Sequence, residues 1–262
     1  ERGLRNQDRS KVLLWPDTFS KHFHPKIAHA AVEVLEHAGY QVTIPQASLC
    51  CGRPLYDFGM LDQARTMLKQ VLSELRGQIE AGTPIIGLEP SCISVFRDEM
   101  TNLLGNDEAA QKMKAQTFLL SEFLVKANYR PPQLHRKVLV HGHCHHKSVL
   151  KFDSEHELLK RIGLDFQVLD SGCCGMAGSF GFEDGKYDVS VKIGERVLLP
   201  AVRNAAADTL IIADGFSCFQ QIEGLTGRKA LHIAEVLQIA IREEKALKAE
   251  SNASPIYADA GK

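Results

Sequence analysis

Two loops that each contain a pair of adjacent cysteines constrain this chain more than any other feature. One is Leu49-Cys50-Cys51-Gly52 and the other is Gly172-Cys173-Cys174-Gly175. Adjacent cysteines cannot close an unstrained disulfide with each other, because their Cα atoms lie about 3.8 Å apart across a trans peptide. The neighbouring glycines allow positive φ and a close approach of the backbone to a bulky group. Both loops are therefore typical of loops that direct two thiols at one metal centre.

The two loops belong to a duplication of the whole chain. Cys50 and Cys173 are 123 positions apart. Cys92 and Cys218 are 126 positions apart, as are Val12 and Val138. Three nearly equal offsets indicate two halves with the same succession of elements. What holds for one half should therefore hold for the other.

Short apolar runs alternate with stretches of helical periodicity and end where the cysteine loops begin. The runs are 11–15, 40–44 and 84–88 in the first half, and 137–141, 166–169 and 209–213 in the second. Among the helices, the spacing predicts one long helix from Met60 to Ala81. Strands that alternate with helices form parallel sheets, which bind ligands at the carboxyl ends of their strands. We therefore predict an α/β fold of two pseudo-repeated Rossmann-like halves, with mainly parallel sheets and the cysteine loops at the carboxyl ends of strands.

The predicted domain organisation follows from these runs and from the length of 262 residues, which suffices for two domains. Residues 1–10 are polar and are expected to form a loose N-terminal segment. The first half should span 11–130 and the second 131–243. The stretch 244–262 is charged and rich in small residues, and it is expected to be a disordered tail.

Charge and cysteine usage exclude several classes of function. Lys and Arg total 31 against 32 Asp and Glu, a net charge of −1 that does not favour a nucleic-acid partner. The sequence has no apolar run of the roughly 18 residues that a transmembrane segment needs, and it begins without the apolar core of a signal peptide. Seven cysteines cannot all pair in disulfides, which favours metal or redox use of the thiols. We expect a cytoplasmic protein, peripheral at the inner membrane only through a partner.

The second half contains the stronger candidate metal site. Four thiolates, the number that an iron–sulfur cluster or a tetrahedral zinc ion requires, are expected from three strand ends. Histidines 141, 143, 145 and 146 surround the first of these cysteines, and alternation along an extended segment would place His143 and His145 on one side and Cys144 and His146 on the other. One functional histidine is expected, with His143 and His146 as the leading candidates. The alternative is that the thiols are buried and inert. The predicted metal ligands are Cys144, Cys173, Cys174, Cys218, His143 and His146.

The first half contains a weaker candidate site. Its thiols are Cys50, Cys51 and Cys92, and Asp17-Thr18 occupies the position of His143-Cys144. Three thiols and a carboxylate are consistent with a vestigial pocket, an incomplete cluster or a partner for the centre in the other half. Gly52 and Gly175 are predicted to let the backbone approach either cofactor. No catalytic residue is predicted, since the chain contains no nucleophile elbow and no P-loop.

The segments SLCCGRPL, EPSC, HGHCHH, SGCCGMAGSFGF and DGFSC resemble the cysteine-rich CCG-domain family. That family includes the cysteine-rich subunit of heterodisulfide reductase and the glycolate oxidase iron–sulfur subunit. The sequence looks most like the C-terminal region of FAD-linked D-lactate or D-2-hydroxyglutarate dehydrogenase fusions. Heterodisulfide-reductase-type domains add a fifth cysteine that binds a noncubane cluster, whereas Val95 and Gln221 stand at the corresponding places here.

The resemblance implies an electron-transfer domain that carries electrons from upstream modules to a quinone or another acceptor. FAD and ferredoxin-like clusters would belong to those upstream domains or subunits, and this chain alone would not oxidise the hydroxyacid. The expected cofactor is an iron–sulfur cluster of the 4Fe-4S type, with zinc or a single iron as alternatives. The competing functions are a zinc-stabilised docking module without redox activity and a thiol/disulfide reductase domain.

Overall fold

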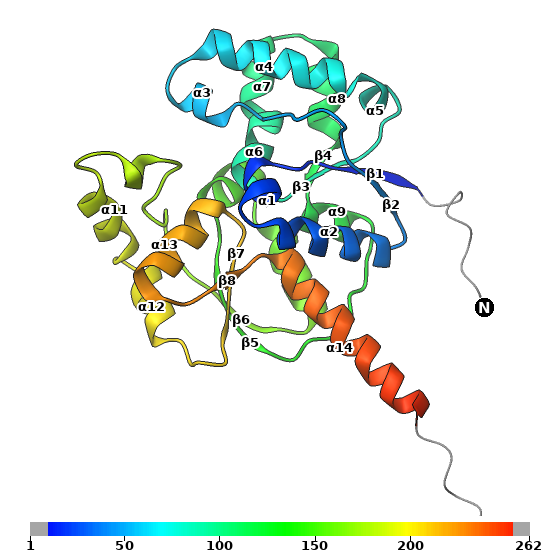
Figure 1. The fold of residues 1–262 in the computed structure, drawn as a ribbon, viewed down its shortest axis with the longest axis vertical. Helices are drawn as coiled ribbons and strands as arrows, with labels where there is room; N and C mark the ends of the chain where they lie inside the picture. The colour runs from blue at the N-terminus through cyan, green and yellow to red at the C-terminus, as the bar shows by residue number, and fades with distance from the viewer. Residues whose placement is uncertain (1–9, 254–262) are drawn as a thin grey trace, which may run out of the picture.

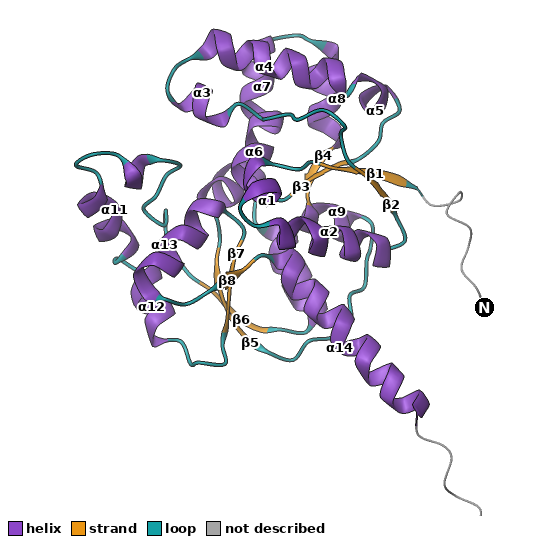
Figure 2. Ribbon diagram, viewed as in Figure 1, coloured by secondary structure: helices purple, strands orange, loops and turns teal. Residues whose placement is uncertain are grey.

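The computed structural model describes residues 10–253, and its strands form two four-stranded sheets with the same topology (Figures 1 and 2). The first sheet has the order β2-β1-β3-β4 and the second β6-β5-β7-β8, and every neighbouring pair is parallel. This arrangement confirms the predicted duplicated α/β fold. The strands are β1 (Lys11–Leu14), β2 (Gln41–Thr43), β3 (Ile85–Gly87), β4 (Thr117–Leu119), β5 (Lys137–His141), β6 (Asp165–Val168), β7 (Leu210–Ala213) and β8 (Ala230–Leu231).

Helices cover the first sheet and project above it as a separate layer (Figure 1). The predicted helix from Met60 to Ala81 is interrupted at Leu75, which is buried, so that α5 turns away from α4. The helices of this half are α1 (Thr18–His22), α2 (Pro25–His37), α3 (Arg53–Asp57), α4 (Leu61–Glu74), α5 (Arg76–Glu80), α6 (Pro90–Ser94), the π-helical turn η1 (Val95–Glu99), α7 (Met100–Leu104), α8 (Glu108–Gln116) and α9 (Leu120–Lys126).

The second half has a similar but smaller set of helices. Its last helix is the longest described in the chain and extends away from the body of the molecule (Figure 1). The elements are the π-helical turn η2 (His146–Leu150), α10 (Asp153–Ile162), the 3-10 turn η3 (Phe180–Phe182), α11 (Tyr187–Gly194), α12 (Leu198–Asn204), α13 (Phe216–Thr226) and α14 (Ile233–Ala253). Within residues 10–253, no helix is long and apolar enough to cross a membrane.

The side chains of strand β1 point alternately into two hydrophobic cores. Val12 and Leu14 point into a core that contains residues of both halves, while Leu13 and Trp15 point into a second core beneath α4 and α8. Successive residues of a strand face opposite sides of the sheet, so one apolar run contributes to both cores. The two sheets are consequently joined by shared apolar packing.

The final helix of each half packs against the first long helix of the other half. Helix α9 of the first half lies against α10, and α14 of the second half lies against α2. Glu33 on α2 accepts hydrogen bonds from Gln238 (2.8 Å) and Arg242 (2.9 Å) on α14. Through this exchange and the packing of η2 on α6, the two halves contact each other near their cysteine loops. The domain boundaries at 130 and 243 stay predictions.

The expected disordered tail is wrong for residues 244–253, which continue helix α14. This stretch is rich in Ala, Glu and Lys, which are strong helix formers, and Glu244 pairs with Lys248 at 2.8 Å. Packing of the start of α14 removes the cost of nucleating a helix, so the charged residues extend it. Residues 1–9 of the predicted loose segment and residues 254–262 of the tail lie outside the described residues.

The sequence pattern did not predict the two edge strands β4 and β8. They contain three and two residues, which is too short for a period of two to stand out from the helices that follow. Both pair with a strand whose other neighbour is the first strand of the half. Their formation therefore depends on an existing sheet.

Docking of α14 can be tested with two leucines on the same helix. Replacing Leu237, which is 0% exposed in the shared core, with alanine is expected to lower the free energy of unfolding by about 2–5 kcal/mol. Leu247 is 67% exposed, and its replacement should change that free energy by no more than about 0.5 kcal/mol. Urea unfolding followed by circular dichroism measures both. Equal effects of the two replacements would contradict the docking.

Candidate metal centre

The four thiols of the second half meet at the carboxyl ends of three strands. Cys144 follows β5, Cys173 and Cys174 lie in the loop after β6, and Cys218 lies in the first turn of α13 after β7. Each of these thiols shifts the pKa of the next in the order Cys144, Cys173, Cys174 and Cys218, and the sulfurs of Cys174 and Cys218 lie within 4.8 Å of each other. Cys174 and Cys218 are buried, whereas Cys144 and Cys173 are partly exposed. The set of predicted cysteines is therefore brought together, with one accessible edge.

These contacts set the protonation of the sulfurs in an alternating order. Hydrogen bonds from Cys144 and then Cys174 hold the pKa of Cys173 far below its usual range. The bond with Cys174 likewise lowers the pKa of Cys218, whereas the pKa values of Cys144 and Cys174 are raised, chiefly by their bonds to Cys173. Four thiolates side by side would repel one another, so full deprotonation requires a compensating cation. Thiols arranged in this way could hold a metal ion or cluster.

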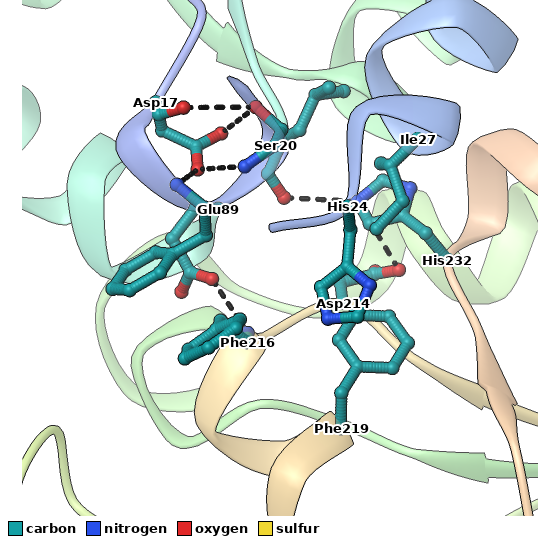
Figure 3. A pocket seen from close by; sticks show the side chains of 11 residues that line it. Asp17, Ser20, His24, Ile27, Glu89, Asp214, Phe216, Phe219 and His232 are labelled. Carbon is teal, nitrogen blue, oxygen red and sulfur yellow. Dashed lines mark hydrogen bonds and ion pairs between the residues drawn. The ribbon is translucent and has the colours of Figure 1, made fainter. Parts of the chain in front are cut away.

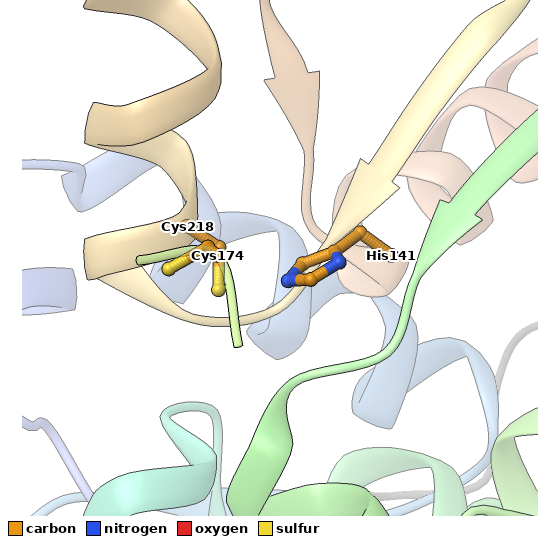
Figure 4. Close-up of side chains that lie close together, drawn as sticks. All are labelled: His141, Cys174 and Cys218. Atoms are coloured by element: carbon orange, nitrogen blue, oxygen red, sulfur yellow. The ribbon is translucent and has the colours of Figure 1, made fainter. Parts of the chain in front are cut away.

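His141 is the imidazole closest to the buried pair of thiols. It is the last residue of β5, and its ring points toward Cys174 and Cys218 (Figure 4). One ligand atom from each of the three residues lies within 4.8 Å of the others. Nδ1 of His141 lies 2.8 Å from Oγ of Ser171, which orients the ring, and its buried Nε2 has no hydrogen-bond partner among the described residues. An unpaired buried nitrogen of this kind fits a ligand to a metal centre.

Gly175 brings its backbone amide close to a cysteine sulfur, while its predicted approach to a cofactor stays a prediction. Its φ is +106°, and its N–H donates to Sγ of Cys173 at 3.3 Å. A backbone N–H that donates to sulfur stabilises the thiolate form of Cys173.

The thiols of the first half form an equivalent but smaller cluster. Cys50 and Cys51 hydrogen-bond each other, and Sγ of Cys51 lies 3.1 Å from Sγ of Cys92 in the first turn of α6. The N–H of Gly52 hydrogen-bonds Cys50, as that of Gly175 does Cys173. The pKa of Cys50 is raised, first by its bond to Cys51 and then by burial. Three of the predicted first-half residues thus share one cluster, with Gly52 beside it.

Two exchanges of residue type distinguish the halves. Thr18 hydrogen-bonds Cys50 in the first half, at the position where Cys144 contacts Cys173 in the second. Trp15 ends the first strand run where His141 ends β5, and its indole packs edge-on against Phe96 with ring centroids 4.8 Å apart. The first half therefore lacks one thiol and one imidazole of the second half's donor set.

Asp17 caps helix α1 and, among the described residues, makes no hydrogen bond to the first-half thiols. Its carboxylate accepts from the N–H groups of Phe19 and Ser20, each at 2.9 Å, and from Oγ of Ser20 at 2.6 Å. Side-chain oxygens committed to an N-cap in this way have little capacity left for a metal. Figure 3 shows Asp17 at one side of a small crevice between the halves. Its predicted role as a cofactor ligand stays a prediction.

The same crevice contains polar bonds that join the halves. Glu89, just after β3, accepts from the N–H of Phe216 at the start of α13, at 2.8 Å (Figure 3). A second bond has the same direction, since Nε2 of His232 lies 3.0 Å from the carbonyl oxygen of Leu88, to which it donates. Burial raises the pKa of Glu89. Both thiol-bearing helices, α6 and α13, are therefore tied to one carboxyl group.

The histidines around Cys144 point in different directions because the segment forms helical turns and is not extended. His143 and His145 stack with ring centroids 5.4 Å apart and share a cluster with Cys144. Burial, followed by the charge of Arg53 on α3, lowers the pKa of His145 to about 4. His146 lies away from the thiols, beside Glu155 and Asp214. From the sequence, His143 and His146 were favoured over His141 as metal ligands. The signal that could have identified His141 is its position as the last residue of an apolar strand run.

The two positions that lack a fifth cysteine are both buried. Val95 begins η1, and Gln221 lies three residues after Cys218 on α13. Nε2 of Gln221 donates to the carbonyl oxygen of Ser190 at 3.1 Å, beside the space that a side chain at Gly175 would enter. Gln221 thus hydrogen-bonds α11 next to the cysteine loop.

Comparison with known proteins gives matches over most of the chain. A subunit of the anaerobic glycerol-3-phosphate dehydrogenase of Escherichia coli (strain K12) is 31% identical over 243 residues, which cover 90% of this chain and 60% of that protein. The chain therefore spans less than two thirds of that relative. Lactate utilization protein A of Bacillus subtilis (strain 168) is 30% identical over 243 residues, covering 87% of this chain and 98% of the relative. The protein of the same name from Halalkalibacterium halodurans is 31% identical over 255 residues, covering 89% and 100%.

The family match divides in the same way as the fold. Residues 17–97 and 138–223 each match the cysteine-rich CCG domain. The two matched segments contain all seven cysteines and both sets of contacts described above. This chain belongs to the cysteine-rich CCG domain family, with one copy of the domain in each half.

Proposed function

We propose that this chain is an iron–sulfur-binding electron-transfer module of a dehydrogenase. Its centre is held in the second half by Cys144, Cys173, Cys174 and Cys218, with His141 beside them. The observation that carries the proposal is that four thiols follow three strands of one parallel sheet, with the sulfurs of Cys174 and Cys218 within 4.8 Å of each other. An iron–sulfur centre of the 4Fe-4S type requires this number of thiolates, and when bound it supplies one-electron redox chemistry.

The residues of the chain have separable roles in this proposal. Cys174 and Cys218 lie on the buried side, where water is excluded, and Ser171 orients the ring of His141. The amide of Gly175 donates to Cys173, and hydrogen bonds to cluster sulfur are one means by which proteins set a reduction potential. Cys144 and Cys173 form the accessible edge, beside α3 of the first half, and a redox partner is expected to approach there.

The names of the relatives suggest the partners. One is a subunit of an anaerobic glycerol-3-phosphate dehydrogenase and the others are lactate utilization proteins. We infer that FAD and ferredoxin-like clusters belong to partner domains or subunits that oxidise a 2-hydroxyacid or a related substrate. This chain would accept their electrons and deliver them to a quinone or another acceptor.

The proposal is tested on protein purified under anaerobic conditions. We expect a brown preparation that contains iron and acid-labile sulfide, and an electron paramagnetic resonance signal that appears or changes on reduction. A colourless preparation with stoichiometric zinc and no redox signal at neutral pH would exclude the electron-transfer role.

One observation favours a second candidate, a zinc-stabilised docking module. The grouping of His141 with Cys174 and Cys218 within 4.8 Å is a mixed thiolate and imidazole set, which suits tetrahedral zinc. X-ray absorption at the zinc and iron edges separates the two candidates. Zinc with sulfur and nitrogen neighbours, and no iron, would support docking.

A further inference from the structure

A buried cluster of ionisable side chains lies apart from the thiols. His146 in η2, Glu155 in α10 and Asp214 after β7 each have a ligand atom within 4.8 Å of the other two. His146 and Glu155 are each 1% exposed, and Asp214 is also buried. Neither the duplicated thiol sites nor the proposed electron transfer uses this cluster.

The polar atoms of this cluster are not satisfied by the surrounding protein. Among the described residues, both ring nitrogens of His146 and both carboxylate oxygens of Glu155 lack a hydrogen-bond partner. The ring of Phe152 packs against His146 with centroids 4.7 Å apart, which restricts how the imidazole can turn. Leaving one buried polar group unpaired costs about 1–3 kcal/mol, so four such atoms side by side require an explanation.

A proton shared between the two carboxyl groups explains only part of this arrangement. It would pair one oxygen of Glu155 with Asp214, whose Oδ1 also accepts from the N–H of Ile233 at 3.0 Å. Both nitrogens of His146 would remain unpaired. A divalent cation would instead accept a lone pair from all three residues, and its charge would balance the two carboxylates in a buried site.

We propose that His146, Glu155 and Asp214 bind a first-row divalent cation of the zinc or iron(II) type. One imidazole nitrogen and two carboxylates form a donor set that suits these ions better than Mg²⁺ or Ca²⁺, which prefer oxygen ligands alone. The site contains no sulfur and is distinct from the thiol cluster. Because all three ligands are buried, its role is structural and not catalytic.

The position of the cluster indicates what the cation would stabilise. Its residues come from three elements of the second half, two of which pack on the first half: η2 on α6 and α10 on α9. Leu150 at the end of η2 is part of the first-half core. A cation that fixes η2 to α10 and to the end of β7 would hold the junction between the halves and, with it, the position of Cys144.

Cobalt(II) provides the test, because its absorption spectrum distinguishes thiolate from nitrogen and oxygen ligands. The full chain is exchanged with Co²⁺ under anaerobic conditions, and cobalt per chain is measured together with the spectrum. In the wild-type protein we expect one equivalent of cobalt that shows visible ligand-field bands but no thiolate-to-cobalt charge-transfer band. Any cobalt bound by thiolates would add to this equivalent. Cobalt bound only through sulfur would overturn the proposal, without affecting the proposed electron transfer.

Two substitutions on α10 make the test specific to the cluster. Glu155→Gln keeps the shape of the side chain and removes its charge. This variant should lose the one equivalent of cobalt that has no sulfur ligands, while the intensity of the thiolate-to-cobalt charge-transfer band is unchanged. Glu157→Gln is the matched control, because Glu157 is partly exposed and pairs with Arg161 at 2.9 Å. It should bind as much cobalt as the wild type. A folded Glu155→Gln protein that binds as much cobalt as the wild type would contradict the proposed site. If that variant does not fold, the cobalt spectrum of the wild-type protein alone tests the proposal.

Discussion

Replacing Cys218 with serine is expected to remove most of the metal from this protein. The thiol is buried in the first turn of α13, where it contacts Cys174 and lies beside His141. Serine is a poor ligand because its hydroxyl stays protonated, so three thiolates would remain where four are required. Loss of a residue that merely supports a metal ligand costs about 10–100-fold in affinity, and loss of a ligand should cost at least as much. Elemental analysis and the visible spectrum after anaerobic purification measure the effect.

Two further variants make this result interpretable. Ser217→Ala is the control, because Ser217 neighbours Cys218 but is partly exposed and hydrogen-bonds only the carbonyl oxygen of Gly178, at 3.3 Å, in the described part of the chain. It should retain the metal. Cys92→Ser makes the equivalent change in the first half, and we expect a much smaller loss there because Thr18 replaces the fourth thiol. Metal retained by Cys218→Ser would contradict the proposed centre, and equal losses in both cysteine variants would place a metal in each half.

Alanine at Gly175 is expected to be far more destabilising than alanine at the equivalent Gly52. Both residues have positive φ, +106° and +81°, which costs roughly 1–2 kcal/mol for a residue with a Cβ. A Cβ at Gly175 would lie 2.1 Å from the carbonyl oxygen of Ser190 in α11, a backbone atom that cannot move alone. At Gly52 the nearest atom is Sδ of Met67 at 3.4 Å, on a flexible side chain. We expect losses of about 1–2 kcal/mol for Gly52→Ala and at least about 3 kcal/mol for Gly175→Ala.

Thermal and urea unfolding of the two glycine variants measure this difference. The metal content of each sample must be determined in parallel, because a metal bound only by the folded state adds to its apparent stability. Gly175→Ala should also bind less metal, since its amide would no longer approach Cys173. Equal destabilisation by the two substitutions would mean that the close packing of the second cysteine loop against α11 is not as described.

The contrast between the halves gives the duplication a functional interpretation. The fold places equivalent cysteines at equivalent strand ends, yet Thr18 replaces a thiol and Trp15 replaces an imidazole in the first half. Trp15 and Phe96 fill the corresponding space with aromatic packing. One half thus contains four thiols and an imidazole at its strand ends, while the other contributes core packing, Arg53 near the accessible edge and the carboxyl group of Glu89 that joins the halves.

The sequence by itself determined the duplicated α/β fold and the meeting of the cysteines at the carboxyl ends of strands. Both depend on signals contained in short windows: apolar runs that form strands, glycines that permit positive φ, and thiols placed directly after the runs. Gly175, Cys173 and Cys174 could be predicted to form a ligand loop without any knowledge of distant residues.

Only the tertiary structure decided which side chains complete the clusters. His146 turns toward Glu155 and Asp214 because η2 is helical and packs on α6 of the other half. The edge strand β8 depends on its pairing with β7, and helix α14 depends on its packing against α2. Some of these contacts join residues that are far apart in the sequence, as Glu33 and Arg242 are. Local propensity and periodicity contain no information about them, because their free energy comes from surfaces that meet only after the halves have folded together.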